Sequence, residues 1–289
     1  IAGGVEHMTR GPYAIAKPST AYGTDAKMYD TSFGWRFVNP KMHAMYGTDG
    51  MGVTAENLVD IHNISREDQD AFAFHSQMKA TKAQESGRLA KEIITVNIPR
   101  RKQEDLIFAD DEFVKPQTKL EILGKLRPAF RKDSSVTAGN SSGLNDGAAA
   151  TIVASQNAVE KYNLKPMARI LSSAVVGVEP RIMGIGPVEA SNKALAKAGL
   201  TMEDMDIIEL NEAFAAQSLA CIRAWGLKDD DPRINPNGGA IAIGHPLGAT
   251  GTRLAHTAAL QLQLTDKKYA LVTMCVGVGQ GYAAVIEKV

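Results

Sequence analysis

The chain has 289 residues, of which 44% are hydrophobic, so it can bury a substantial core and is long enough for two compact units. Its 32 basic residues balance its 32 acidic residues and no apolar run reaches membrane-spanning length, so we expect a soluble protein with neither nucleic acid nor a membrane as partner. The two cysteines, Cys221 and Cys275, exclude a disulfide framework and a C-x-x-C metal pattern, and they favour a reducing, cytoplasmic compartment.

Residues 1–65 predict a strand, surface excursions and the start of a helix. Residues 1–6, I-A-G-G-V-E, follow no initiator Met and look like the end of a strand, so we expect an N-terminal portion, with any targeting peptide, to be missing. Residues 11–65 are rich in Gly, Pro, Thr, Tyr and Met without a sustained period, which is typical of surface loops. Within them we expect a helix after Met51.

The clearest helix of the first half is predicted over residues 69–86. Ser65 and Asp68 form an S-x-x-D capping pattern ahead of it, and Gly87 is a suitable stop. Its predicted apolar face contains three residues at helical spacing, Ala71, Phe74 and Met78. Residues 100–125 mix charged and single apolar residues, and we expect edge strands and loops there.

From Val136 onwards the pattern changes to alternating strands and helices. A turn-dense run at residues 137–147 leads into a predicted strand at 148–154. The later predicted strands cover residues 168–173, 205–210, 270–275 and 282–287. The predicted helices between them cover residues 187–198 and 213–225. Strands that alternate with helices predict an α/β domain in which helices cover a sheet.

The segment from Asn235 to Gly251 contains the strongest candidate for chemistry, His245. The segment reads N-P-N-G-G-A-I-A-I-G-H-P-L-G-A-T-G and includes five glycines, which permit close backbone approach and positive φ. Pro246 restrains the turn just after the imidazole. These flanks distinguish His245 from the other five histidines, for which surface or core positions are the ordinary interpretation.

Cys275 ends a predicted apolar strand and precedes the turn G-V-G-Q-G. Its sulfur is therefore expected at the rim of a sheet, where α/β folds place their sites. The alternative is a small buried hydrophobic residue, which describes most free cysteines and which we assign to Cys221. The backbone N–H groups of the turn can point at an anion, and they favour a functional role for Cys275.

Asn211 and Glu212 follow a predicted strand and precede a predicted helix. The Asn211 carboxamide can hold a water against a developing oxyanion, and Glu212 can orient a neighbouring ring or the loop itself. The alternative for Asn211 is N-capping of the helix, because Asn is a preferred cap. Together the amide, the imidazole, the thiol and the backbone N–H groups are parts suited to acyl transfer.

Five segments together resemble the thiolases, the acetyl-CoA acyltransferases. They are I-A-G-G-V-E-H-M-T-R at 1–10, T-A-G-N-S-S-G-L-N-D-G at 137–147, N-E-A-F-A-A at 211–216, G-G-A-I-A-I-G-H-P-L-G-A-T-G at 238–251 and C-V-G-V-G-Q-G at 275–281. The resemblance runs the whole length of the chain. Within the family, residues 31–40 and 229–239 look most like the 3-oxoadipyl-CoA thiolases of aromatic-compound degradation.

The resemblance implies an α/β fold of five layers, α-β-α-β-α, from two duplicated halves with a loop domain inserted in the first half, which is incomplete here. Residues 1–10 and 136–164 would be the remnant of the first half, residues 11–135 the inserted loop domain and residues 165–289 the second half. This division accommodates an internal likeness, since the turn-dense run and the C-terminal turn each precede a strand of small residues.

The catalytic roles that the resemblance implies fall on four residues. His245 matches the histidine that activates the nucleophilic cysteine and helps bind the thioester oxygen. Cys275 matches the second cysteine, which moves a proton to and from the leaving carbanion or the incoming CoA thiol. Asn211 matches the residue that fixes an oxyanion-hole water, and the Gly277 N–H matches an oxyanion donor. The family's nucleophile lies in a C-x-S-G-type motif upstream of the A-G-G-V-E strand, and these 289 residues contain no such motif.

Coenzyme A is expected as a substrate, with no covalently bound cofactor and no metal. The resemblance implies CoA contacts at eight residues, Met51, Phe130, Ala138, Gly139, Ser142, Met183, Ala213 and Phe214. The implied reaction is acyl transfer between a 3-oxoacyl-CoA and CoA, in which 3-oxoadipyl-CoA and CoA give succinyl-CoA and acetyl-CoA. A homodimer or homotetramer is implied as well.

Three alternatives stay open. The chain can be a CoA-ester-binding fragment without turnover, because the nucleophile is absent. It can be a hydrolase with Cys275 as nucleophile and His245 as base, although Cys275 precedes a glycine turn rather than the helix N-terminus that would favour a thiolate. It can be a related condensing enzyme acting on carrier-protein substrates, against which the N-E-A-F and C-V-G segments argue.

Overall fold

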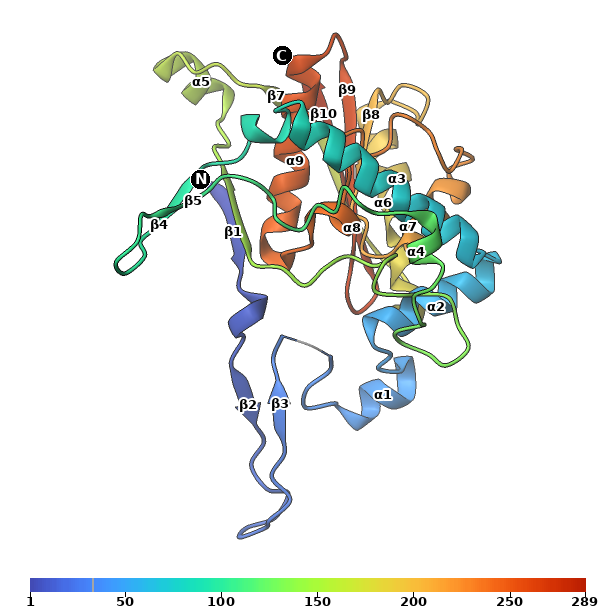
Figure 1. The fold of residues 1–289 in the computed structure, drawn as a ribbon. Helices are drawn as coiled ribbons and strands as arrows, with labels where there is room; N and C mark the ends of the chain where they lie inside the picture. The colour runs from blue at the N-terminus through green and yellow to red at the C-terminus, as the bar shows by residue number, and fades with distance from the viewer. Residues whose placement is uncertain (33) are drawn as a thin grey trace.

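A four-stranded mixed sheet forms the centre of the computed structural model, which describes residues 1–32 and 34–289 (Figure 1). In spatial order its strands are β7 (Ala168–Gly177), β10 (Gln280–Lys288), β9 (Tyr269–Val276) and β8 (Ile207–Leu210). β8 and β9 run parallel, with Leu210 opposite Thr273, whereas β10 is antiparallel to β7 and β9. The segments that follow β8 and β9 therefore leave the sheet at the same edge.

Two helices cover the two faces of this sheet, and α9 also supports a second sheet. α6 (Gly186–Ala198) packs on β7, β9 and β10, and α9 (Leu247–Leu264) packs on β8, β9 and β10. α9 also contacts β1 (Ala2–Glu6) and β6 (Gly147–Thr151), which pair in a two-stranded antiparallel sheet. The layers thus follow the order α6, central sheet, α9 and β1–β6, which is an α-β-α-β sequence of layers.

Alternate residues of the strands enter two separate cores, as the two-residue period of a strand requires. Ile208 packs in the core that contains Leu195 of α6, whereas its neighbour Ile207 packs with Leu254 of α9. All four residues of β8 are buried, which explains why its sequence does not alternate between apolar and polar residues. The predicted α6 stop is confirmed, since Gly199 caps the helix with a left-handed φ of 68°.

Helices α2 (Met51–His62), α3 (Arg66–Glu85) and α7 (Ala215–Ala224) pack together beside the sheet. The predicted cap of α3 is confirmed, because Ser65 Oγ accepts the Asp68 N–H at 3.0 Å. The predicted apolar face of α3 is wrong, since Ala71, Phe74 and Met78 are only partly buried. The buried face includes Phe72, Ala73, Ser76, Gln77 and Ala80. Its polar members are buried because distant segments supply their hydrogen-bond partners.

Shorter elements surround this core. They are the hairpin β2 (Tyr13–Ile15) and β3 (Met28–Asp30), the hairpin β4 (Val96–Ile98) and β5 (Leu106–Phe108), the helices α1 (Pro40–Tyr46), α4 (Leu120–Leu123), α5 (Gln156–Tyr162) and α8 (Ala240–Ile243), and the 3₁₀ turns η1 (Met8–Arg10), η2 (Leu89–Lys91) and η3 (Pro180–Ile185). The hairpin β2–β3 extends away from the layers (Figure 1), in agreement with the surface excursions predicted for residues 11–65.

The sequence pattern misses α1, α4, α5 and α8 and extends β6 too far. A signal for α1 exists, because Asn39 caps it by accepting the Lys41 N–H at 2.9 Å and Pro40 opens the helix. The strand predicted at 148–154 ends at Thr151. Phe33, part of the segment that carries the subfamily resemblance, lies outside the described residues.

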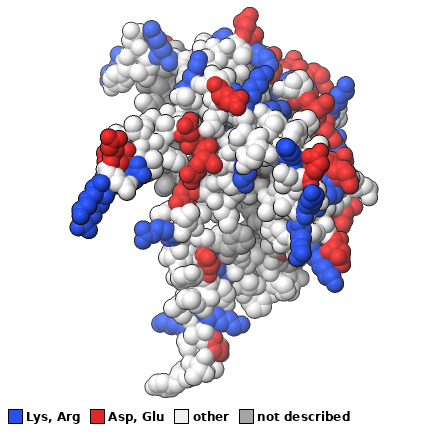
Figure 2. Space-filling model, in the orientation of Figure 1, with Lys and Arg blue, Asp and Glu red and all other residues white. Residues whose placement is uncertain are grey.

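None of the helices in the described ranges combines the length and apolarity needed to cross a membrane. On the face shown in Figure 2, basic and acidic side chains are interspersed, as the balanced composition leads one to expect. The pairing of β1 with β6 joins residues on either side of the 11–135 segment. The three-part domain division itself stays a prediction.

Candidate active site

The amide of Asn211 and the thiol of Cys275 lie at the edge where β8 and β9 end. The Asn211 N–H, just after Leu210, donates to Thr273 O at 3.0 Å, which extends the parallel pairing by one residue. Cys275 follows Thr273 by two residues and lies near the end of β9. The structure therefore brings two predicted site residues to the carboxyl ends of neighbouring parallel strands, the usual location of sites in α/β sheets.

His245 reaches the same place from the segment between α8 and α9. Gly244, which precedes it, has a φ of 91° and thereby turns the chain toward the site. His245 Nδ1 lies 2.8 Å from Thr250 Oγ1, and Nε2 lies 3.3 Å from Asn211 Nδ2. Since the Thr250 hydroxyl donates to Pro246 O at 2.9 Å, its oxygen accepts the Nδ1–H. This network assigns the proton to Nδ1, so the Nε2 lone pair is the acceptor that the Asn211 amide meets.

The electrostatic environment keeps the His245 imidazole neutral. Burial, assisted by the nearby positive charge of Arg253, lowers the pKa of His245 to about 4. At neutral pH the ring is therefore a proton acceptor through Nε2, where the Asn211 amide meets it. The Oδ1 atom of Asn211 is buried and has no protein hydrogen-bond partner in residues 1–32 and 34–289, so it can accept from a water or a substrate. The capping alternative for Asn211 is wrong, because the N-cap of α7 is Phe214.

Cys275 is only 6% exposed and lies among apolar side chains. They belong to a small core cluster of Ala55, Val136, Met183, Ala213, Phe214 and Ala216. Burial raises the pKa of Cys275 to about 12, so its thiol is protonated at neutral pH. A protonated thiol can donate a proton, whereas the hydrolase alternative needs a thiolate at this residue. Cys221 is fully buried in α7, as predicted, and burial raises its pKa as well.

Glu212 is buried and holds the loop that leads to the imidazole. Its carboxylate accepts hydrogen bonds from Ser76 Oγ at 2.6 Å, Asn235 Nδ2 at 2.7 Å and Ile241 N at 3.2 Å. Burial raises the pKa of Glu212, and these three donors oppose the shift. Of the two roles predicted for Glu212, the geometry favours orientation of the loop, because these partners lie in the loop and in α3 rather than on the imidazole.

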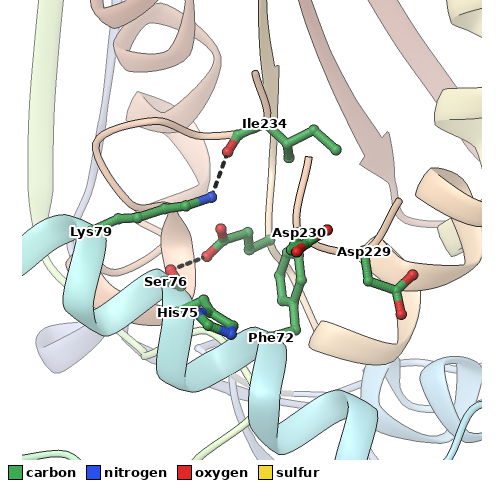
Figure 3. A pocket seen from close by; sticks show the side chains of 8 residues that line it. Phe72, His75, Ser76, Lys79, Asp229, Asp230 and Ile234 are labelled. Atoms are coloured by element: carbon green, nitrogen blue, oxygen red, sulfur yellow. Dashed lines mark hydrogen bonds between the residues drawn. The ribbon is translucent and has the colours of Figure 1, made fainter. Parts of the chain in front are cut away.

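Two hydrogen bonds from α3, one to Glu212 and one to the loop, are drawn in Figure 3. Ser76 and Lys79 project from α3, and Lys79 Nζ donates to Ile234 O at 2.8 Å. Ser76 Oγ also accepts the Gly239 N–H at 3.1 Å. A side chain at Gly239 would place its Cβ 2.3 Å from the Glu212 carboxyl carbon, so only glycine permits this approach. A cavity of about 50 Å³ lies beside these residues, and burial lowers the pKa of Lys79 within it.

Most of the residues with an implied CoA contact lie around Cys275. Met183, Ala213 and Phe214 share its cluster, and Phe130 packs edge-to-face on Phe214 with ring centroids 5.8 Å apart. Met51 Sδ lies 3.9 Å from the position that a Cβ on Gly277 would take, which places both beside the C-terminal turn. The Ser142 N–H donates to Ala213 O at 3.0 Å. Ala138 is exposed, and Gly139 faces Leu123 and Leu126 rather than Cys275.

Two family models match the chain, "Thiolase, N-terminal domain" over residues 1–157 and "Thiolase, C-terminal domain" over residues 164–288. The chain belongs to the thiolase family. This thiolase is 56% identical to the β-ketoadipyl-CoA thiolase of Acinetobacter baylyi and 53% identical to the 3-oxoadipyl-CoA/3-oxo-5,6-dehydrosuberyl-CoA thiolase of Escherichia coli. Each alignment covers 100% of this chain and 72% of the relative.

A solved structure extends the comparison to the fold. The crystal structure of human mitochondrial 3-ketoacyl-CoA thiolase in complex with CoA matches this thiolase with a TM-score of 0.90 and 43% identity. The match covers 99% of this chain and 70% of that chain. The predicted fold class and the predicted membership of an acyltransferase family are thereby confirmed.

The sequence pattern of this thiolase did not reveal two ionisable residues, Glu209 and Arg253, whose side-chain polar atoms are buried. Glu209, in β8, and the guanidinium of Arg253, in α9, are buried and have no hydrogen-bond partner in the described part of the chain. Burial raises the pKa of Glu209 to about 8, while the charge of Arg253 opposes the shift. In the sequence, Glu209 could have been noticed as the one acidic residue of the otherwise apolar segment I-I-E-L. No three His, Cys, Asp or Glu side chains of residues 1–32 and 34–289 are grouped to hold a metal ion.

Proposed function

We propose that the protein transfers an acyl group between a 3-oxoacyl-CoA and CoA, with 3-oxoadipyl-CoA as substrate and succinyl-CoA and acetyl-CoA as products. One observation carries the proposal: a neutral imidazole, with Nε2 facing the Asn211 amide, lies beside the strand end that bears a protonated Cys275. The names of the two bacterial relatives support 3-oxoadipyl-CoA as the substrate, and the CoA complex of the human relative supports CoA as a ligand.

In the proposed reaction a thiolate attacks the 3-oxo carbon and the bond between C2 and C3 breaks. His245 takes the proton from the attacking thiol through Nε2, which is why a neutral ring is needed. The departing acetyl-CoA carbanion takes the proton of the Cys275 thiol. The Cys275 thiolate then takes the proton of the CoA thiol, and the CoA sulfur attacks the carbonyl carbon of the enzyme-bound thioester. The bond between the acyl carbon and the enzyme sulfur breaks, succinyl-CoA is released, and the departing enzyme thiolate regains its proton from the His245 imidazolium. The protonated state of buried Cys275 suits this donor role.

Two groups are proposed to stabilise the oxyanions of these steps. The Asn211 amide holds a water against one of them, and the N–H of Gly277 donates to the other. Glu212 keeps the loop between Asn235 and Ile241 in place, and this loop leads to His245. CoA is proposed to lie along Met51, Phe130, Ala138, Gly139, Ser142, Met183, Ala213 and Phe214.

We do not assign the role of acyl-accepting thiolate to Cys221 or Cys275. Both cysteines are buried, and burial raises both pKa values. The resemblance to thiolases assigns this role to a C-x-S-G-type motif. Activity in the cytoplasm is proposed because free, buried cysteines suit a reducing compartment. A homodimer or homotetramer is proposed from the resemblance.

Intact mass under denaturing conditions tests the assignment of roles. The protein is measured before and after exposure to acetyl-CoA, and CoA binding is followed by calorimetry on the same sample. We expect CoA to bind and Cys275 to remain unmodified, with any acetyl group mapping to a cysteine outside the 289 residues. Acetylation of Cys275 would instead favour the hydrolase alternative, and a lack of CoA binding would contradict the proposed function.

A further inference from the structure

A groove of about 450 Å³ lies between α1 and the turn that follows β9. Its volume falls within the range of small-molecule sites. Most of its lining is apolar and includes Met42, Met45 and Tyr46 of α1 together with Val178 and Val278. Met45 and Tyr46 are exposed, so this surface is open to a ligand. Among the described lining residues, Lys41 alone carries a charge.

The groove borders the C-terminal turn that contains Gly277. Val278, which lines the groove, directly follows Gly277, whose N–H is the proposed oxyanion donor. On the opposite side of the turn, the Val178 N–H donates to Gly279 O at 2.8 Å, so the wall formed by Val178 is attached to the same turn. This adjacency favours the groove as the place for the acyl chain of a substrate whose carbonyl oxygen lies at Gly277.

The chemistry of the lining suits a chain with an apolar middle and an anionic end. Methylene groups can pack on Met42, Met45 and Val278, where water is displaced from apolar surface. The ammonium of Lys41 has no ion-pair or hydrogen-bond partner among residues 1–32 and 34–289, so its charge is available to a carboxylate. The Lys41 backbone N–H donates to Asn39 Oδ1, so only the ammonium of Lys41 is left to bind a carboxylate.

We propose that this groove holds the acyl chain of a 3-oxoacyl-CoA that ends in a carboxylate, and that Lys41 selects this class by pairing with the terminal carboxylate. The proposal rests on the proposed function, because it places the thioester end of the same substrate at Gly277. Lys41 is thus a specificity residue that does not touch the reacting carbonyl. An uncharged acyl chain of equal length makes the same apolar contacts but lacks the ion pair.

Binding of two matched thioesters that lack the 3-oxo group, and so cannot be cleaved between C2 and C3, tests this proposal on the purified protein. Adipyl-CoA and hexanoyl-CoA have the same chain length and differ in the terminal carboxylate, and free CoA serves as the reference ligand. We expect adipyl-CoA to bind about fivefold more tightly than hexanoyl-CoA, as suits one partly screened ion pair. The substitution Lys41→Met is expected to abolish this preference, and high salt is expected to reduce it.

Two further variants complete the test. Lys165→Met removes an exposed lysine remote from the groove and is expected to keep the fivefold preference. Met45→Ala removes apolar wall and is expected to weaken both esters alike relative to CoA. Equal binding of the two esters by the unsubstituted protein, or a preference that survives Lys41→Met, would overturn the proposal while leaving the proposed function intact. If CoA itself does not bind, the proposed function fails and the groove proposal fails with it.

Discussion

The imidazole Nε2 of His245 lies 3.3 Å from the amide nitrogen of Asn211, 34 residues earlier in the chain. With Nδ1 held by Thr250, this contact leaves one ring orientation and one tautomer. The amide donates to the lone pair of Nε2 and marks where a thiol proton would be received. The proposed proton acceptor is therefore oriented in the absence of substrate, which lowers the reorganisation needed for proton transfer.

The contribution of His245 to stability should fall on acidification, because the folded protein holds its imidazole in the neutral form. Its pKa of about 4 in the folded protein lies below the ordinary value of 6.5, so the unfolded chain binds more protons at this group between these two values. The contribution is complete above about pH 6.5 and is lost as the pH falls toward 4, by up to about 3 kcal/mol. Glu209, whose pKa is raised to about 8, has the opposite pH dependence, so the protein is compared with the variant His245→Asn. Urea unfolding of both between pH 4.5 and 7.5 should give a difference in the free energy of unfolding that changes on acidification, and a difference independent of pH would contradict the assignment.

Replacement of Asn211 by Asp should raise the pKa of His245. A carboxylate beside Nε2 stabilises the imidazolium, so the pKa moves from about 4 toward its ordinary value. NMR titration of the imidazole resonances measures the change. Asn211→Ala is the matched control, which removes the contact without adding charge, and it should produce a smaller rise than Asp. Equal titration of both variants would show that residue 211 does not face Nε2.

Replacement of Thr250 by Val should release the tautomer of His245. The hydroxyl that accepts the Nδ1–H is lost while the shape of the side chain is kept, so the Nε2–H form becomes populated. Imidazole nitrogen chemical shifts distinguish the two tautomers directly. Thr250→Ser retains the hydroxyl and should restore the Nδ1–H form; a Ser variant that behaves like Val would argue against a role for the hydroxyl.

Loss of the Ser76 hydroxyl should destabilise the loop that precedes His245. Ser76→Ala removes one of three donors to the buried Glu212 carboxylate, and we expect a cost of about 1–3 kcal/mol in the free energy of unfolding. Urea unfolding measures it, and hydrogen exchange of the Gly239 and Ile241 amides should accelerate selectively. Ser86→Ala, at the exposed end of the same helix, is the control; its hydroxyl donates only to Ala83 O, so its loss should leave the exchange of the Gly239 and Ile241 amides unchanged.

Neither cysteine should react with iodoacetamide in the folded protein. Burial raises the pKa of Cys275 to about 12, so little thiolate exists at pH 8, and Cys221 is fully buried in α7. Mass spectrometry after a timed exposure should show no label in the native protein and two labels after unfolding. Rapid native labelling confined to Cys275 would indicate a reactive thiolate and would revive the hydrolase alternative.

Local sequence predicted most elements of the second half and singled out the candidate site residues. Alternating strands and helices with Gly199 as a stop predicted β7, α6, β8 and α7, because capping and periodicity depend on residues within a few positions of one another. The glycines around His245 marked it for the same reason, since a conformation that needs glycine leaves its signal in the sequence itself.

Tertiary structure decided what those residues do to one another. The partner of Glu212 on α3 lies 136 residues away, and the apolar pattern of α3 indicated a different face because it cannot report where a distant carboxylate will lie. The protonated Cys275, the neutral His245 and its tautomer follow from burial and from hydrogen bonds that form only when β8, β9 and the loop after α8 meet. Electrostatic and hydrogen-bond energies depend on distances in space, and the local pattern of a sequence does not encode them.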